Sequence, residues 1–346
     1  MMEKEADITA EEFAQYDRQI RLWGLDAQKR LRQAKVLVVG IGGLASEVVK
    51  NVVLAGVKAL TMLDDKVVSE SDMGSQLLVT HLDMGKNRAE ASMARTQPLN
   101  PNVIVSCDKM PISEKPDDFF REFDIVCLTE VPFEERIRIN LICRSSGIKF
   151  FCGDVFGFYG YCFADLGMHD FVREEVKKEK KYDLDGEPEA KKSKLDEKGK
   201  KEEEKILVRV TDEFCSLEES LTEDWSTRSR RIMRQSSYIF FIIKVIDKFK
   251  EKTGRSPTFG KEDQNLLLEL RNEVLKDSNV SETYIPEEFP QFCISELNPI
   301  CAITGGVLGQ EIIKAASQRD APHNNYFFYN GRSHAGIVDQ ICPPFK

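Results

Sequence analysis

A glycine-rich turn between an apolar strand and an apolar helix constrains this chain more than any other feature of its sequence. The segment Lys35–Gly56 reads KVLVVGIGGLASEVVKNVVLAG, with Gly40, Gly42 and Gly43 after a β-branched run. The first glycine permits a tight turn, the second lets backbone approach a phosphate, and the small Ala45 allows close helix–strand packing. The N–H groups at the helix start then face an anion. The segment therefore predicts the strand–turn–helix of a nucleotide-binding fold.

Length and charge limit the classes of protein that remain. A chain of 346 residues exceeds one compact core and predicts about two domains. The net charge of −9 argues against nucleic-acid binding, which requires a basic face. No apolar run approaches the ~18 residues of a membrane span, since the strongest, Tyr238–Ile243, ends at Lys244. The acidic start, MMEKEADITAEE, argues against a secretory signal or a mitochondrial presequence.

The nine cysteines occur singly along the chain, at 107, 127, 143, 152, 162, 215, 293, 301 and 342. No two are three residues apart, so the sequence contains no CxxC zinc knuckle, and the four histidines show no ligand spacing. We therefore expect no metal site. The odd count and the strand contexts predict reduced, mostly buried thiols in the cytosol or nucleus.

Apolar strands alternate with helical patterns from residue 36 to residue 156. Such alternation implies right-handed crossovers and a mostly parallel sheet with helices on both faces, an α/β Rossmann-like fold. The strands are expected at 36–39, 59–64, 103–107, 124–129 and 149–156, and the helices at 46–55, 86–97, 116–122 and 133–146.

A helix-rich insertion is expected to interrupt this pattern. Residues 173–205 are almost wholly charged or polar and cannot bury enough apolar area to offset their ordering entropy, so we expect them to be disordered. A short strand is expected at 206–210, helices around 228–251 and 264–276, and a further helix at 300–316 with Asn298 as N-cap. Terminal strands are expected at 326–329 and 335–340. This organisation predicts a first sheet-domain part (1–165, with an N-terminal arm opened by a Thr9–Glu12 capping box), an insertion (166–290) and a return to the sheet domain (291–346).

The glycine turn alone does not establish a working site. Asp64 and Asp65 end the next strand about 20 residues on, where a dinucleotide fold places its ribose-binding carboxylate. The spacing therefore fits two interpretations. One is a nucleotide pocket built from Gly40, Gly42, Gly43 and Asp64, and the other is a structural relic of such a pocket.

Several motifs occur together in the order seen in the activating enzymes of ubiquitin-like modifiers. They are YDRQIRLWG, the glycine turn, LDDKVVSESDMGSQLL, DMGKNRAEA, SELNPICAITGGVLGQEIIKA and PHNNYFFYNG. The resemblance covers roughly residues 13–165 and 290–340, and it implies one of the two related adenylation-type domains of those enzymes. Within the family, the short chain and charged mid-chain loop most closely resemble the small, non-catalytic subunits of heterodimeric SUMO activators.

Departures from the family pattern identify the supporting half rather than the active half. The active half carries S-N-L-N-R-Q-F, whose Asn and Arg hold ATP, whereas Gly74 and Ser75 stand at those positions here. Serine cannot present a guanidinium fork to a phosphate. The magnesium-binding Asp of the family aligns with Glu130, and one basic position survives as Lys86 or Arg88. The resemblance thus implies a degenerate, non-catalytic pocket.

A catalytic cysteine is also missing from the expected context. In the family, the thioester-forming cysteine is followed by Thr, and none of the nine cysteines here has that neighbour. Cys215 and Cys293 lie in the insertion, without the basic or helix-start surroundings that would lower a thiol pKa. We expect both to be structural.

Arg18 is the residue for which the resemblance implies a catalytic role. The family's Tyr-x-Arg-Gln element resembles an arm that reaches the partner's ATP site, where its arginine contacts phosphate in trans. The other interpretation is a surface arginine paired with Asp17 or Glu12. Arg21 is a secondary candidate, while Tyr16, Leu22 and Trp23 are expected to pack the arm against the domain.

The resemblance implies a support subunit of an obligate heterodimer that activates SUMO. ATP, magnesium and the catalytic cysteine would belong to the large partner subunit, with no cofactor, nucleic acid or membrane bound by this chain. Lys191–Lys194 is either a nuclear import signal or a solvated charge run, and the resemblance favours the nucleus, with the cytoplasm as a second location. Three alternatives remain: an autonomous NAD-dependent oxidoreductase, a self-sufficient adenylating enzyme, and a scaffold that contributes no residue to chemistry and differs from the main interpretation only at Arg18.

Overall fold

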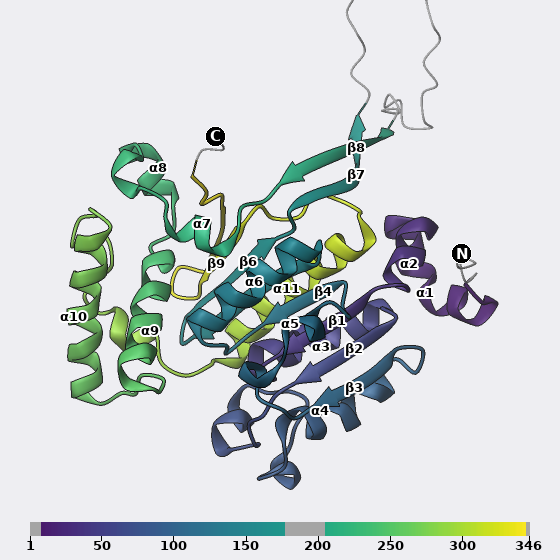
Figure 1. Cartoon of the computed structure of the whole chain (residues 1–346), viewed down its shortest axis with the longest axis horizontal. Coiled ribbons are helices and arrows are strands. Elements are labelled where there is room, and N and C mark those ends of the chain that lie inside the picture. Colours follow the sequence, from purple (N-terminus) through teal and green to yellow (C-terminus); the bar gives the residue numbers. More distant parts are fainter. Residues whose placement is uncertain (1–7, 177–204, 344–346) are drawn as a thin grey trace, which may run out of the picture.

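A central β-sheet organises the chain, as a computed structural model shows for residues 8–176 and 205–343. Within these residues, eight strands form one sheet in the order β10-β9-β6-β5-β4-β1-β2-β3 (Figure 1). The strands are β1 (Lys35–Val39), β2 (Ala59–Leu63), β3 (Ile104–Asp108), β4 (Ile125–Leu128), β5 (Lys149–Phe156), β6 (Tyr159–Asp165), β9 (Tyr326–Asn330) and β10 (Ala335–Asp339).

The predicted parallel sheet is confirmed, and an antiparallel extension is added to it. Strands β5, β4, β1, β2 and β3 pair in parallel, whereas β6, β9 and β10 continue the sheet beyond β5, each antiparallel to the strand before it. The sequence analysis did not assign β6. Its aromatic run follows β5 directly, because Gly157 turns the chain with a φ of +57°. A side chain at that glycine would collide with the Phe292 carbonyl.

Helices cover both faces of the sheet, as the alternation predicted. Val36 and Val38 point to the face covered by α3 (Gly43–Ala55) and α11 (Asn298–Ser317). Leu37 and Val39 point to the face covered by α5 (Asp117–Phe120) and α6 (Phe133–Ser146). The buried residues therefore form two apolar layers, one on each side of the strands.

Helices α3 and α11 approach each other closely at glycines. A Cβ at Gly305 would lie 2.6 Å from the Glu47 Cβ, and a Cβ at Gly309 would lie 2.9 Å from the Asn51 Cβ. The small residues of α11 therefore serve the close contact that the sequence predicted. Helix α11 begins at Asn298 with Leu297 as its N-cap, so the expected Asn298 N-cap is wrong by one residue.

The predicted insertion (166–290) contains a β-ribbon, of which the sequence predicted only part of the second strand, at 206–210. Strands β7 (Met168–Val176) and β8 (Lys205–Glu213) pair antiparallel and project from the body (Figure 1). Residues 173–176 and 205, which were expected to be disordered, therefore belong to strands. Cross-strand pairing overrides their polar composition there. The rest of the predicted disordered loop, 177–204, lies outside the described residues.

The expected single helix over 228–251 is instead two helices. Helix α8 (Arg230–Gln235) ends at Ser236, whose backbone is extended, and α9 (Ile239–Thr253) follows. The Ser237 Oγ accepts a hydrogen bond from the Ile239 N–H at 3.3 Å. Serine competes with helical hydrogen bonding and favours such caps. The insertion is completed by α7 (Leu217–Leu221) and α10 (Lys261–Asp277).

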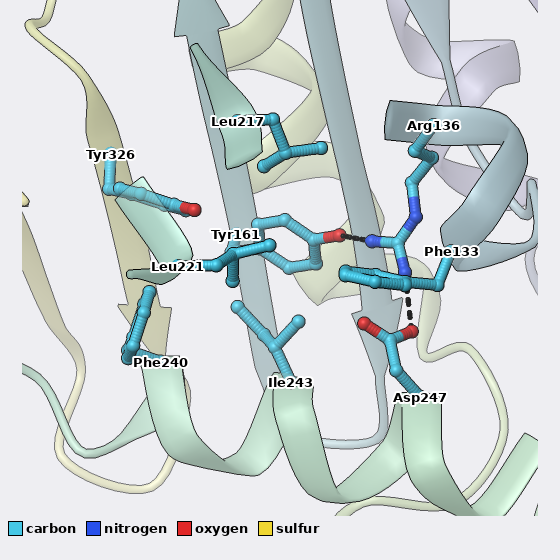
Figure 2. Close-up of a pocket in the computed structure, with 9 residues that line it drawn as sticks. All are labelled: Phe133, Arg136, Tyr161, Leu217, Leu221, Phe240, Ile243, Asp247 and Tyr326. Carbon is cyan, nitrogen blue, oxygen red and sulfur yellow. Dashed lines mark hydrogen bonds and ion pairs between the residues drawn. The ribbon is translucent and has the colours of Figure 1, made fainter. Parts of the chain in front are cut away.

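A buried arginine joins the insertion to the sheet domain, as Figure 2 shows. Arg136 on α6 donates a hydrogen bond to the Tyr161 hydroxyl of β6 at 2.6 Å, and it is also paired with Asp247 on α9. The void beside these groups has a volume of about 10 Å³, which is room for roughly one water molecule. This void is therefore a packing feature rather than a ligand site.

The remaining helices are α1 (Ala10–Trp23), α2 (Leu25–Leu31) and α4 (Arg88–Thr96). Helices α1 and α2 lie at the opposite side of the molecule from α9 and α10 (Figure 1). The predicted capping box is present at the start of α1, where Thr9 and Glu12 exchange hydrogen bonds. Among the described helices, none combines the length and apolarity needed to cross a membrane.

Two neighbouring glycines of α11, one in contact with α3 and one not, allow the packing of the two helices to be tested. We expect Gly305→Ala to destabilise the protein by about 1–3 kcal/mol, because the new methyl overpacks against α3. Gly306→Ala should instead stabilise it by roughly 0.5–1 kcal/mol, because a Cβ there meets nothing within 4 Å and alanine is the better helix former. Urea unfolding of the two variants measures both changes, and equal effects would contradict the close packing.

Candidate functional site

A cavity of about 900 Å³ opens where the parallel strands end and α3 begins. Ligands of open α/β sheets bind at this edge. The cavity is walled by Lys66–Ser75 on one side, Glu130–Glu134 on another, and the end of α9 with the following loop on the third. In the described chain, Gly40–Ala45 does not line this cavity. Other groups therefore stand between the predicted phosphate-binding turn and the open space.

The turn itself has the geometry that its glycines predicted. Gly40 has a φ of +77°, and a Cβ at this position would overlap the Thr129 carbonyl. A Cβ at Gly42 would overlap the Glu130 carboxylate. At Gly43, a Cβ would lie 2.7 Å from Glu296 Oε2. The space beside Gly42 and Gly43 is thus taken by two carboxylates of the chain.

Asp64, the predicted ribose ligand, is bonded inside the protein. Its Oδ2 accepts the Ile41 N–H at 2.6 Å and the Arg88 Nε–H at 2.8 Å, and its Oδ1 accepts the Lys66 N–H at 2.9 Å. The side chain is buried, and burial raises the pKa of this carboxyl even though Arg88 opposes the shift. Asp64 therefore anchors the turn and has no free face for a sugar.

Arg88 is the basic group that the pocket retains. From the first turn of α4, its guanidinium contacts Asp64 at 2.7 Å, Asp72 at 3.0 Å and Glu130 at 2.8 Å. Burial alone would lower the pKa of Arg88, but the surrounding carboxylates hold it above its ordinary value. Of the two predicted positions, Arg88 is thus the one at the site, whereas Lys86 pairs outside it with Asp83. All three carboxylates compete with any phosphate for this arginine.

Glu130 occupies the position predicted to align with a magnesium ligand. Its backbone is left-handed, with a φ of +54°, and its N–H donates to Asp154 Oδ1 at 2.7 Å. Although burial would raise it, Arg88 and Lys66 lower the pKa of Glu130 to about 2. The carboxylate is therefore an internal counter-ion. Within residues 8–176 and 205–343, no group of His, Cys, Asp and Glu side chains is arranged to hold a metal ion.

Gly74 and Ser75, which replace the ATP-binding Asn and Arg, lie on the cavity wall. Ser75 is buried, and its hydroxyl donates to Glu296 Oε2 at 3.1 Å. Gly74 has open space around it. Neither residue brings positive charge to the cavity, so the two positions expected to contact ATP lack a side chain that pairs with phosphate.

Glu296 is a site residue that the sequence analysis missed. Its carboxylate accepts the Gly43 N–H at 2.7 Å and the Leu44 N–H at 3.2 Å. Burial, reinforced by the charge of Glu130, raises the pKa of Glu296 to about 7. The sequence does show an acidic residue two positions before helix α11. Its contact with the glycine turn, 253 residues earlier, depends on tertiary packing and could not be recognised from that position alone.

Arg18 lies away from this pocket, on the exposed face of α1. The helix is fixed through its other face, where the buried Tyr16 hydroxyl accepts from Asn100 Nδ2 at 2.9 Å and Gln19 donates to the Leu54 carbonyl at 3.2 Å. Among the residues that the structure describes, none pairs with the Arg18 guanidinium. The alternative pairings with Asp17 and Glu12 do not form there.

Of the other predictions for the N-terminal arm, some agree with the structure and one does not. Asp17 pairs with Arg21 at 3.0 Å and Glu12 pairs with Arg32 at 2.7 Å. Tyr16 packs as expected, and Trp23 donates from Nε1 to Gln28 at 3.1 Å. Leu22 does not pack, because it is 73% exposed on the outer face of the helix. Its predicted packing role is therefore wrong.

The cysteines have the surroundings of structural thiols. Cys215 and Cys293 are buried, and burial raises the pKa of Cys293 to about 12 and that of Cys215 higher still. A thiol with a raised pKa carries little thiolate at neutral pH, and the thiolate is the nucleophile. These surroundings favour the structural interpretation of both residues.

The fold and the site together define an α/β domain whose glycine-rich turn is bonded to carboxylates of the same chain. The family model described as the ThiF family matches residues 16–343, and the chain belongs to this family. It is 50% identical to the SUMO-activating enzyme subunit 1 of Xenopus tropicalis, over 98% of this chain and 99% of that protein. The identity to the protein of the same name is 46% in Homo sapiens, over 99% of this chain and 100% of that protein, and 47% in Danio rerio, over 96% and 95%. The resemblance predicted from the sequence motifs is confirmed.

Removing the Arg88 side chain should destabilise the folded protein. We expect Arg88→Met to lower the free energy of unfolding by about 3–5 kcal/mol, because it leaves buried carboxylates without their partner. Lys86→Met, two residues away, should change stability little, because the Lys86 side chain is exposed and Asp83 keeps a second partner in Arg95. Chemical denaturation of both variants measures this contrast, and similar losses would show that Arg88 is not the charge on which the pocket depends.

Glu296 should make stability depend on pH. A carboxyl whose pKa is higher in the folded than in the unfolded state favours folding when protonated, and this contribution is lost as pH rises from the ordinary value to about 7. Relative to Glu296→Gln, the wild-type protein should therefore lose on the order of 3 kcal/mol between pH 4.5 and pH 8. Urea titrations across this range test the difference, with Glu70→Gln on the same cavity wall as the control. A difference that is constant with pH would refute the shift.

Proposed function

We propose that this chain is the non-catalytic subunit of a heterodimeric SUMO-activating enzyme. The name of its vertebrate relatives, SUMO-activating enzyme subunit 1, supports both the modifier and the existence of a partner subunit. Identity near 50% over almost the full chain supports carrying that role to this protein. The partner would be the large subunit, which would hold ATP, magnesium and the catalytic cysteine.

The occupied pocket is the observation that carries the non-catalytic assignment. Arg88 is bonded to three carboxylates, and the donors at the start of α3 are bonded to Glu296. Adenylation needs cationic groups free to meet the triphosphate. Here the Arg88 and Lys66 side chains are already paired with carboxylates of the chain, so chemistry is expected at the partner's site.

In the proposed reaction, the SUMO C-terminal carboxylate attacks the α-phosphate of ATP at the partner's site, which forms the acyl-adenylate and releases pyrophosphate. The partner's thiol then takes the acyl group as a thioester and AMP is released. We propose that this chain supplies Arg18 in trans. The arginine lies on the outer face of a helix that Tyr16 and Gln19 fix to the body. Because no residue that the structure describes forms an ion pair with its guanidinium, Arg18 could meet phosphate without first losing such a partner, which favours preorganised stabilisation of the developing charge.

The remaining assignments extend this proposal. The parts 1–165, 166–290 and 291–346 would act as the two sections of a supporting adenylation-type domain and an insertion between them. The protein would act in the nucleus, with Lys191–Lys194, outside the described residues, as the import signal. Substituting these lysines in a fluorescent fusion tests the signal, and unchanged nuclear accumulation would argue against it.

The catalytic role of Arg18 has a matched control one turn away. Modifier-dependent ATP–pyrophosphate exchange should occur with the complex, not with this chain alone, and should fall by on the order of 100-fold or more with Arg18→Ala. Arg21→Ala should change the rate little, since Arg21 is exposed and already paired with Asp17.

Complex formation is verified by size-exclusion chromatography for each variant, so that loss of pairing is not mistaken for loss of chemistry. Full activity of an intact Arg18→Ala complex would leave the chain as a scaffold. Exchange by the lone chain would contradict the non-catalytic assignment itself. An equal loss with Arg21→Ala would point to a general effect of charge on the arm.

A further inference from the structure

The Glu296 carboxylate contacts the groups that a nucleotide fold uses to hold phosphate. Its oxygens accept the N–H groups of Gly43 and Leu44, at the start of the 13-residue helix α3, and the hydroxyl of Ser75. Backbone N–H groups at a helix start bind anions because they lack partners within the helix and the helix dipole is positive there. The three donors come from two separate segments and converge on one carboxylate.

Glu296 differs from the nearby Glu130 in the groups that neutralise its charge. Glu130 is paired with Arg88 and Lys66. For Glu296, by contrast, none of the described lysines, arginines or histidines forms an ion pair. The start of α3 and the Ser75 hydroxyl are therefore its stabilising partners. A phosphate held by a glycine-rich turn depends on the same kind of donor.

The backbone around Glu296 is built to hold it there. Ser295 is left-handed, with a φ of +61°, and its carbonyl accepts the Gly157 N–H at 2.6 Å. Glu296 also forms a parallel bridge with Gly157. A non-glycine residue in the left-handed region costs free energy and persists where surrounding contacts require it. The direction of the carboxylate is thus fixed by the chain on both sides.

We propose that Glu296 is an intramolecular substitute for a nucleotide phosphate, which closes the glycine-rich turn of this chain to polyphosphate ligands. The assignment explains why the turn keeps its glycines although it does not line the cavity. Gly43 gives the carboxylate room to reach the backbone, just as it would for a phosphate. It also goes beyond the proposed function, because a support subunit could equally have an empty pocket that still binds nucleotide.

Binding of a free polyphosphate to the full chain tests this substitution. Titration calorimetry with ADP and with inorganic pyrophosphate should show little binding to the wild-type protein. Glu296→Ala should bind either ligand at least on the order of tenfold more tightly, because hydrogen bonds to a charged group are worth that factor when their donors are released.

Two control variants distinguish the effect of removing the Glu296 side chain from the effect of removing negative charge. Glu296→Gln keeps the side chain in place without the charge, so it should bind much less tightly than the alanine variant. Glu70→Ala removes a negative charge from the same cavity wall without exposing the donors of α3, and it should behave as wild type. Equal gains in all three variants would mean general charge repulsion and overturn the proposal.

Other outcomes are equally decisive. Tight ADP binding by the wild-type chain would show that Glu296 does not close the turn, and no gain with Glu296→Ala would show that it does not replace a phosphate. If the alanine variant does not fold, Glu296→Ser, which shortens the side chain but keeps a polar oxygen, undergoes the same titration. These measurements do not involve the partner subunit or Arg18. Their outcome is therefore independent of the outcome of the ATP–pyrophosphate exchange assay.

Discussion

The close contact between α3 and α11 is the interaction on which the rest of this structure depends. These helices belong to segments about 250 residues apart, and glycines on α11 let their backbones approach. The contacts advance in the same direction along both helices, from Gly305 near Glu47 to Gly309 near Asn51. The residues just before α11 are thereby placed beside the start of α3. Glu296 reaches the glycine turn because of this packing, and no local feature of its own segment would bring it there.

Charge balance explains how several buried carboxylates can share this pocket. A buried carboxylate is costly unless it has a cation or hydrogen-bond donors. Arg88 meets that need for Asp64, Asp72 and Glu130, and the start of α3 meets it for Glu296. A triphosphate entering the cavity would have to displace these partners one by one. Each displaced carboxylate would remain buried near the incoming negative charge, so stability of the empty pocket and affinity for nucleotide oppose each other.

How much the sequence could predict depended on the range of the interactions involved. The strand–turn–helix at Gly40–Ala45 was predictable because glycine geometry and apolar periodicity act locally. Lys86 and Arg88 could not be separated by pattern, since the choice depends on α4 beginning at Arg88 after the Asn87 N-cap. Glu296 was not predictable, because its contact requires the α3–α11 packing. The break at Ser236–Ser237 was predictable in principle from the tendency of serine to cap helices, and the strong apolar run Tyr238–Ile243 obscured it.

The two arginines of this chain that matter most have opposite surroundings, and the difference bears on how a catalytic half and a supporting half can share one fold. Arg88 is enclosed by carboxylates and stabilises the domain that contains it. Arg18 stands on an exposed helix face whose opposite side is fixed to the same domain. Keeping a guanidinium unpaired in water costs little free energy, whereas keeping one unpaired in a buried pocket costs much. A subunit that has filled its own nucleotide site can therefore still present a preorganised cation to another molecule, provided that the cation lies outside the filled pocket.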